Sequence, residues 1–173
     1  MIITVEDLKK QVDTGTADDD LIAVKLEAIE AVIRAYTNNN FQQREIRFAG
    51  QSTDSMIHGD PRYMRTGDTV QISASGVNDG LYVITAIDDY GIEVDPPVMA
   101  TDFNLVTKIQ YPADVKQCAV DLFKWKQTMG DKVGVKSETI SRHSVTYEDS
   151  ATLFMGYPVG ILNGLNLHKK ARC

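Results

Sequence analysis

Large apolar residues recur near the amino end of the chain at intervals of four, three, four and three. They are Ile22, Leu26, Ile29, Ile33 and Tyr36. This spacing places them all on one face of a helix. Residues 18–20 before them are aspartates, which stabilise the positive end of a helix dipole, and residues 38–40 after them are asparagines. We predict a long amphipathic helix between these two runs.

Local signals predict two further helices. Thr4 is followed three residues later by Asp7, the arrangement in which a threonine caps a short helix and an acidic residue supports it. Farther along, Pro112 and Asp114 begin a second apolar stripe, and Gly130 follows it. The stripe consists of Val115, Cys118, Ala119, Leu122 and Phe123. We predict a second long helix between Pro112 and Gly130.

The apolar period shortens toward two between residues 44 and 110, where Gly, Asp, Ser and Pro also become frequent. Val70 and Ile72 alternate with polar neighbours, as in a half-buried strand. Residues 76–80 and 88–91 are rich in Asn, Asp and Gly, which tolerate the positive φ angles of hairpin turns. We predict an antiparallel unit of roughly four to six short strands that forms a small barrel or a curled sheet.

Residues 150–167 carry no charged side chain, and glycine or proline recurs every few residues. This composition suits neither a stable helix nor a long central strand. We therefore predict an extended carboxy-terminal arm that a second surface, in the same chain or in a partner, must cover. Before it, residues 137–147 mix Ile140 and Val145 with polar residues, and we predict one extended strand or a hairpin there.

Together these elements predict an α+β fold: a small helical bundle with an inserted antiparallel β unit and an extended carboxy-terminal arm. The helical core would comprise residues 1–43 and 111–130, the inserted β domain residues 44–110, and the interaction arm residues 131–173. The two helical parts are expected to pack together, because neither can bury its apolar stripe alone.

Composition limits the classes of function that the chain can have. The 173 residues have a hydrophobic fraction of 43% and a formal net charge of -6. One domain with a buried core is the first expectation, and the acidity argues against tight nucleic-acid binding through neutralised phosphates. The two cysteines, Cys118 and Cys173, make no disulfide framework, which is typical of a reducing compartment. No apolar run reaches the ~18 residues of a membrane span, so we predict a cytoplasmic product without membrane contact.

The sequence carries no pattern typical of catalysis. His58, His143 and His168 lie far apart, and none stands at metal-ligand spacing from a cysteine or another histidine. Neither a phosphate-binding glycine loop nor a nucleophile elbow is present. Paired carboxylates such as Asp88 and Asp89 have a turn role available. We predict no enzyme activity, no catalytic residues, no metal and no cofactor.

Four segments, taken in order, resemble the head–tail connector, or adaptor, proteins of tailed bacteriophages and prophages. Residues 3–9 resemble the family's capped first helix, and residues 18–38 its long amphipathic helix. Residues 111–116 resemble the start of its second long helix, and residues 135–147 with the glycine-rich tail resemble its carboxy-terminal arm. The likeness covers the two ends of the chain, whereas the β unit is larger than the connection that many such proteins have there.

The resemblance implies a structural virion component of the neck, made and assembled in the cytoplasm of the bacterial host. Such proteins form a ring, commonly a dodecamer, under the portal protein after DNA packaging. The ring extends the channel for DNA ejection and docks the next head-completion, stopper or tail protein. Genomic DNA would pass without sequence-specific binding, because an acidic wall repels its backbone. The β insert would decorate the outside or the tail-facing side of the ring.

The arm would supply the contacts with the portal protein and with neighbouring subunits. Its predicted partner-binding residues are Leu153, Phe154, Tyr157, Ile161, Leu162, Leu165, Lys169, Lys170 and Arg172. The apolar members would become buried on assembly. The basic members would meet nucleic acid or an acidic groove, although a solvated terminus is the plainer interpretation.

Two alternatives stay open. One is a tail-end or stopper protein of the same neck. The other is a small β-barrel binding module that recognises a peptide, a sugar or a single strand. Its supporting cluster is Arg44, Arg47, Arg62, Tyr63 and Arg65, which nearby acidic residues oppose. A concave aromatic or basic surface on the β unit would favour this module, and a pocket with convergent titratable groups would favour an enzyme.

Overall fold

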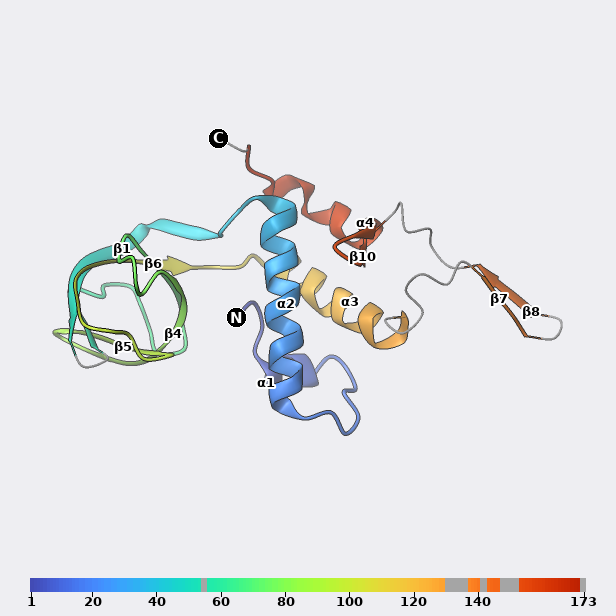
Figure 1. Cartoon of the computed structure of the whole chain (residues 1–173), viewed down its shortest axis with the longest axis horizontal. Helices are drawn as coiled ribbons and strands as arrows, with labels where there is room; N and C mark the ends of the chain where they lie inside the picture. The colour runs from blue at the N-terminus through green and yellow to red at the C-terminus, as the bar shows by residue number, and fades with distance from the viewer. Residues whose placement is uncertain (54–55, 130–136, 141–142, 147–152, 172–173) are drawn as a thin grey trace. The chain divides into compact units, whose positions relative to one another are not determined.

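The computed structural model describes residues 1–53, 56–129, 137–140, 143–146 and 153–171. The chain divides into two compact units, which appear in Figure 1. The barrel unit is Asn40–Gln110, and the helical unit combines Met1–Asn39 with Tyr111–Cys173.

The barrel unit is built from six antiparallel strands. They are β1 (Gln42–Thr53), β2 (Met56–His58), β3 (Thr69–Ser73), β4 (Gly80–Asp88), β5 (Gly91–Asp95) and β6 (Thr101–Ile109). The order around the barrel is β1-β2-β5-β4-β3-β6, and β6 pairs back with β1. The turn from β4 to β5 is stabilised by Asp88, whose Oδ1 accepts hydrogen bonds from the N–H groups of Tyr90 at 2.7 Å and Gly91 at 2.8 Å. Closure removes the exposed edges that an open sheet would present.

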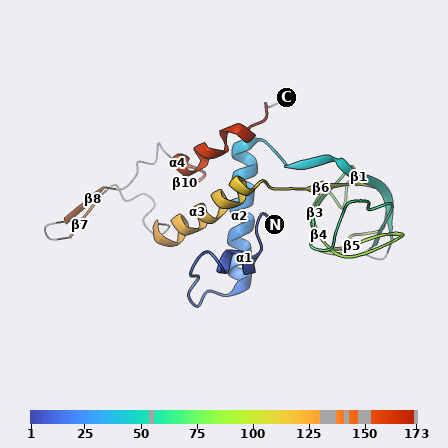
Figure 2. The same cartoon turned by 180° about the vertical axis from the view of Figure 1, so that it is seen from behind.

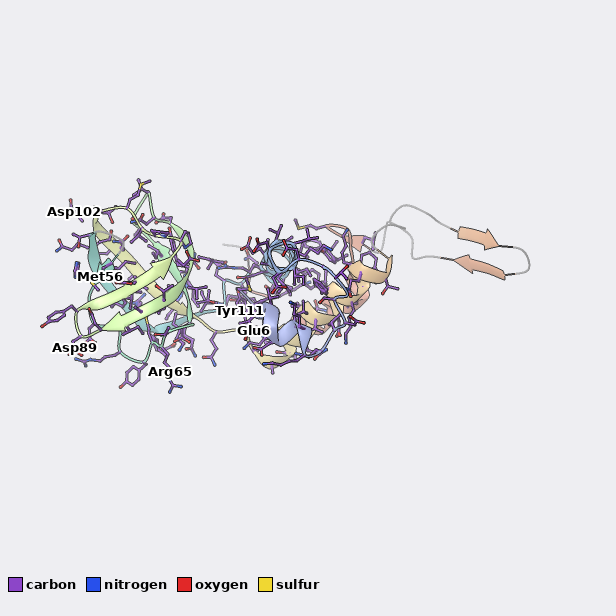
Figure 3. All side chains as sticks on the ribbon, turned by 90° about the horizontal axis from the view of Figure 1, so that it is seen from below. Glu6, Met56, Arg65, Asp89, Asp102 and Tyr111 are labelled. Atoms are coloured by element: carbon purple, nitrogen blue, oxygen red, sulfur yellow. The ribbon has the colours of Figure 1, made fainter. Side chains whose placement is uncertain are left out.

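Alternate side chains of the strands fill the barrel. The buried core consists of Phe48, Ile57, Met64, Val70, Ile72, Ile84, Ile92, Val94, Val98 and Val106. On β5, for example, Ile92 and Val94 are buried and Glu93 between them is exposed. Figure 3 draws the side chains of this unit on its ribbon. Barrels of about eight strands are already filled by side chains, and this smaller barrel is filled in the same way.

Two glycines allow the short strand β2 to lie close to its neighbours. A Cβ atom added at Gly50 would stand 1.6 Å from the carbonyl oxygen of His58, and one added at Gly91 would stand 2.1 Å from that of Ile57. Both obstacles are backbone atoms, so no side-chain rotation can relieve the clash. Glycine is therefore required at both positions for β2 to stay paired with β1 and β5.

The helical unit is organised around two helices, α2 (Asp19–Thr37) and α3 (Ala113–Met129), which cross in Figures 1 and 2. Both long helices predicted from the apolar stripes are confirmed. Ile22, Leu26, Ile29 and Ile33 of the α2 stripe are fully buried. The helix ends where Asn38 adopts a left-handed conformation at φ 48°.

A short helix, α1 (Val5–Lys9), precedes α2. Its first turn is capped as predicted, because Oγ1 of Thr4 accepts a hydrogen bond from the N–H of Asp7 at 3.1 Å. Leu8 of α1 is fully buried, so the short helix contributes to the core of the helical unit.

Residues 153–171, which we call the C-terminal segment, fold into short elements that pack on α2 and α3. These elements are β9 (Leu153–Phe154), β10 (Tyr157–Pro158), α4 (Val159–Leu162) and the 3₁₀ helix η3 (Asn163–His168). β9 and β10 pair antiparallel across a turn in which Met155 and Gly156 take φ angles of 49° and 81°. Figures 1 and 2 both show the segment beside the two long helices.

A separate hairpin is formed by β7 (Ser137–Ile140) and β8 (His143–Thr146). Its ladder runs from the pair Ser137–Thr146 to the pair Ile140–His143. Of the two forms predicted for this stretch, one extended strand or a hairpin, the structure shows the hairpin.

The predicted fold class is wrong. The chain is α+β, but a closed six-stranded antiparallel barrel dominates it rather than a helical bundle. Of the two forms predicted for the β unit, a small barrel or a curled sheet, the structure shows the barrel. Closure depends on β6 pairing with both β1 and β3, which are far from it in sequence. The extended carboxy-terminal arm is also wrong for residues 153–168, which form a small hairpin and two short helices. Gly156 makes the turn of the small hairpin with a positive φ, and Tyr157, Leu162 and Leu165 are buried against the same chain.

Candidate interaction surfaces

The C-terminal segment carries most of the residues predicted to bind a partner. Tyr157, Leu162 and Leu165 are buried, with Leu162 and Leu165 fully so, whereas Leu153, Phe154 and Ile161 are half-buried. Lys169 and Lys170 are exposed, and Arg172 lies outside the described residues. The structure thus brings the apolar members together, but against their own chain. Their role in partner binding stays a prediction, and for the buried members it would require the segment to detach.

Tyr36 of α2 is the main anchor of the segment. Its ring meets the Phe154 ring edge-on, with centroids 5.4 Å apart, and Nζ of Lys169 stands 3.8 Å from its ring centroid. Its hydroxyl lies 3.2 Å from Oδ1 of Asn163 and 3.1 Å from Oδ1 of Asn166. Because a phenol has one proton, it donates to one of these oxygens at a time.

A second set of contacts joins the segment to α3. The rings of Trp125 and Tyr157 lie 6.0 Å apart, and burial raises the pKa of the Tyr157 hydroxyl. The thiol of Cys118 lies 3.7 Å from the carbonyl oxygen of Ile161 and donates to it. Burial raises the pKa of Cys118 to about 11, so the thiol stays protonated and unreactive at neutral pH.

Polar contacts hold the end of the segment. Nε2 of His168 lies 2.6 Å from Oδ2 of Asp114 at the start of α3, and this contact holds the pKa of the Asp114 carboxyl below its usual range. The N–H of Lys170 donates to the carbonyl oxygen of Thr37 at 2.8 Å. Nδ2 of Asn38 donates to the carbonyl oxygen of Ala171 at 3.0 Å. The segment therefore also satisfies one orphan carbonyl group at the end of α2, that of Thr37.

Glu30 is a buried carboxylate that joins α2 to the start of α3. It is 3% exposed, and its Oε1 accepts a hydrogen bond of 2.6 Å from the hydroxyl of Tyr111. Burial, followed by the Glu30 charge, raises the pKa of Tyr111. Arg34 supplies a cation at 3.8 Å from Oε1. Because the carboxylate is fully engaged with structural partners, we assign it a structural role.

A buried amide cluster ties together two loops of the barrel unit. Asn78, 2% exposed, donates through Nδ2 to the carbonyl oxygen of Met99 at 2.8 Å and to Oδ1 of Asn104 at 3.1 Å. Its Oδ1 accepts from the N–H of Met99 at 2.9 Å. Nδ2 of Asn104 donates to the carbonyl oxygen of Gly50 at 3.2 Å. Every member bonds another member or the backbone, so the cluster fixes the loop before β4 against the loop before β6.

The loop between β2 and β3 displays an aromatic residue in a fixed conformation. Tyr63 is 79% exposed and has a left-handed φ of 64°, which is unfavourable for a tyrosine unless its surroundings hold it. Nζ of Lys108 on β6 provides that hold, because it donates to the carbonyl oxygen of Tyr63 at 3.3 Å and to Oδ2 of Asp68 at 2.5 Å. The same Asp68 oxygen accepts from the N–H of Arg65 at 2.8 Å.

The basic cluster predicted for a binding module is partly assembled. Arg62 and Arg65 are exposed on this loop with Tyr63. Arg44 and Arg47 lie on β1. Gln43, the residue before Arg44, pairs with Lys108 of β6, and the side chain of Lys108 contacts the Tyr63 loop. Arg62 is already paired with Asp60, at 2.6 Å.

Several exposed side chains of the barrel were not predicted from the sequence. Val77, Tyr90, Met99 and Phe103 are between 49% and 76% exposed. Tyr90 is linked to the Tyr63 loop, because its carbonyl oxygen accepts from the N–H of Gly59 at 2.9 Å. Val77 and Met99 are linked through the Asn78 amide cluster. A signal existed for Val77 and Tyr90, since both are large residues inside predicted turns.

The described part of the chain contains neither a metal-binding cluster nor a helix suited to cross a membrane. No group of three or more His, Cys, Asp or Glu side chains there could hold a metal ion. No helix there combines the length and apolar character that a membrane crossing requires. Of the histidines, His58 lies 2.6 Å from Oγ1 of Thr53 and His168 lies against Asp114. The side chain of His143 is outside the described side chains.

The sequence matches no protein-family model, and no curated protein matches it significantly.

Proposed function

We propose that this chain is a non-catalytic docking protein in which the small β-barrel is the binding module. One observation carries the proposal. The barrel interior is filled by large apolar side chains, whereas large side chains are exposed on its loops and strand ends. They are Tyr63, Val77, Tyr90, Met99 and Phe103. A filled barrel has no room for an internal ligand, so its contacts are made on the outside.

The exposed side chains are presented by restrained backbone. Lys108 and Asp68 fix the Tyr63 loop, and the Asn78 amide cluster fixes the positions of Val77 and Met99. Scattered exposed apolar residues are ordinary on a protein surface. Large residues presented on a fixed backbone lose less entropy on binding than residues on a mobile loop, which is a property of interface anchors.

The resemblance to head–tail connector proteins supplies the setting that we propose for this module. In that setting the chain is a structural component of a phage neck, which assembles with copies of itself, the portal protein and the next neck or tail protein. The acidity of the chain supports a place beside a DNA channel, because DNA can slide along a wall that does not bind it. This placement rests on the sequence resemblance and on the acidity of the chain.

The test is sedimentation of a lysate from cells that produce the chain together with phage particles, with the chain traced by mass spectrometry. We expect it with DNA-filled heads and tailed particles, and not with empty precursor shells. A chain that stays in the slowly sedimenting fraction while particles form would overturn the proposed setting. A virion structural protein traced in the same gradient controls for particle recovery.

A second candidate is suggested by the Tyr63 loop, where an exposed tyrosine stands beside Arg62 and Arg65. Tyrosine rings stack on bases and arginines meet phosphates, so this loop fits a nucleic-acid single strand. Fluorescence anisotropy with a labelled oligonucleotide tests it. Tyr63→Ser should weaken binding at least fivefold and Phe103→Ser should leave it unchanged. Absence of binding to the wild-type chain at ~0.1 mM protein would exclude this candidate.

A further inference from the structure

The C-terminal segment contains the only asparagine of the chain that glycine follows, Asn163 before Gly164. Asparagine is among the thermolabile residues of proteins. Its side-chain carbonyl carbon can be attacked by the backbone nitrogen of the next residue, and glycine hinders this attack least because it has no side chain and rotates most freely. Both residues are exposed, so water reaches them. The pair therefore has the composition and the solvent access that deamidation requires.

The docked segment holds this pair in a conformation that opposes the reaction. Asn163 ends α4 and begins η3 with helical φ and ψ angles of -58° and -30°, and its N–H donates to the carbonyl oxygen of Val159. Side chains on a helix tilt toward its amino end, whereas the next backbone nitrogen lies on the carboxyl side. The nitrogen of Gly164 can therefore reach the side chain of Asn163 only when this part of the backbone leaves the helical conformation.

Contacts with the helical unit keep that conformation in place. Oδ1 of Asn163 lies 3.2 Å from the hydroxyl of Tyr36, which holds the amide when it donates to this oxygen. Leu162 and Leu165, on either side of Asn163 in the chain, are both fully buried. The pair thus becomes reactive only when the segment opens locally.

We propose that Asn163 is a deamidation site that the docked C-terminal segment blocks, and that the reaction prevents an opened segment from docking again. In the first step the backbone nitrogen of Gly164 bonds to Cγ of Asn163. The bond from Cγ to Nδ2 breaks, and ammonia leaves with the amide proton. Water then opens the ring that has formed. Attack of water at Cγ gives aspartate and attack at the backbone carbonyl carbon gives isoaspartate, and in both cases the nitrogen of Gly164 regains a proton.

Isoaspartate is the product that changes the structure. The backbone then runs through Cβ and Cγ of residue 163, which adds one atom to the chain between Leu162 and Leu165. A helical backbone places both of these buried side chains in a close-packed core, so a longer connection cannot place both. Aspartate keeps the backbone length, and its oxygens still accept from the hydroxyl of Tyr36.

The inference goes beyond docking by the barrel and does not depend on it. It bears on the C-terminal segment, whose buried residues could bind a partner only after the segment detaches. Detachment releases Asn163 from the helical conformation, so deamidation limits the time during which an opened chain can return to the docked form.

The test incubates the full chain at neutral pH and follows the mass increase of deamidation, with peptide mapping to locate it. The chain unfolded in urea gives the rate without the docked segment, and the native chain should react at least about tenfold more slowly. Gly164→Ala is the chemical control, because an added Cβ meets no atom within 4 Å and should leave the fold intact. Its side chain hinders ring closure, so it should react slowly in both states.

Variants of Tyr36 test the role of docking, since they leave the sequence around Asn163 unchanged. Tyr36→Phe removes the hydroxyl contact and should raise the native rate at least about twofold. Tyr36→Ala also removes the ring contact with Phe154 and should raise it at least about fivefold. The matched control, Tyr63→Ala, changes an exposed tyrosine of the barrel unit and should react like wild type. Far-UV circular dichroism checks each fold, and Tyr36→Phe decides the question where Tyr36→Ala unfolds.

The fluorescence of Trp125 tests whether the product prevents docking, because its ring lies 6.0 Å from that of Tyr157 in the segment. Chains deamidated in urea are separated into their aspartate and isoaspartate forms and refolded. Asn163→Asp and the aspartate form should regain the native signal, and the isoaspartate form should not.

Any of four results would overturn the inference. They are a native rate equal to the rate in urea, Tyr36 variants that react no faster than wild type, deamidation confined to other asparagines, and an isoaspartate form that regains the native signal.

Discussion

Replacing Leu162 with alanine tests whether the C-terminal segment is part of the folded core or a detachable arm. Leu162 lies in α4 and is fully buried in the helical unit. Truncating such a residue costs about 2–5 kcal/mol, through lost burial and the cavity left behind. For a chain of this length about 3 kcal/mol lowers the melting temperature by roughly 6–12 °C. Because domain stabilities are only about 5–15 kcal/mol, this loss is a large fraction of the total.

The assay is thermal and urea unfolding followed by the fluorescence of Trp125, the single tryptophan of the chain. It lies 6.0 Å from the ring of Tyr157, so it reports on the packing between α3 and the segment. Leu167→Ala is the matched control, because Leu167 is in the same segment but 93% exposed. We expect it to change stability by less than about 0.5 kcal/mol. Equal and small effects of the two substitutions would refute the docked segment.

Three further outcomes follow from the structure. Gly91→Ala should destabilise the barrel by about 3 kcal/mol or more, because the new Cβ would stand 2.1 Å from a backbone oxygen. Gly160→Ala, whose Cβ has no atom within 4 Å, should change the stability little. Equal urea midpoints of the two variants, measured by circular dichroism, would contradict this. In a chain lacking the terminal cysteine, Cys118 should resist alkylation at pH 7.5 until unfolding, because burial raises its pKa to about 11; rapid labelling of the native chain would refute its burial. The pKa of Asp114 is lowered by its histidine partner, so the stabilisation from this contact is present above about pH 4 and is lost as pH falls through the lowered pKa. The free energies of unfolding of Asp114→Asn and wild type should therefore differ at pH 6 and converge in acid. A difference that stays constant with pH would argue against the contact.

The helices were predictable from sequence because their signals are local. The α2 stripe, its aspartate start and its asparagine end are all contained within about 20 residues, and the observed helix runs from Asp19 to Thr37. Turn chemistry likewise identified the β4–β5 hairpin, where Asp88 caps the turn. The sequence left a small barrel and a curled sheet as alternatives and could not decide between them, because closure depends on the pairing of β6 with two distant strands, β1 and β3.

The candidate site was predicted less well. Glycine and proline in residues 153–168 were taken to exclude a stable helix or a long strand, which led to the prediction of an extended arm. The segment instead folds into short elements, with Gly156 in a turn and Gly160 and Gly164 inside two short helices. Tyr36 was predicted as one more stripe residue, and its ring and hydroxyl contacts involve residues more than 100 positions away. Glu30 did carry a signal, because it stands four residues after Leu26 and three before Ile33 and so falls on the buried stripe.

The central claim, that the barrel surface is the docking module, is tested most directly by hydroxyl-radical footprinting of the chain before and after it joins its assembly. Tyr63, Tyr90, Met99 and Phe103 are reactive side chains with exposures of 79%, 76%, 69% and 49% in the free chain. We expect assembly to protect strongly at least one of two linked pairs, Tyr63 with Tyr90 or Met99 with Val77. Unchanged labelling of all four, with protection confined to the helical unit, would contradict it.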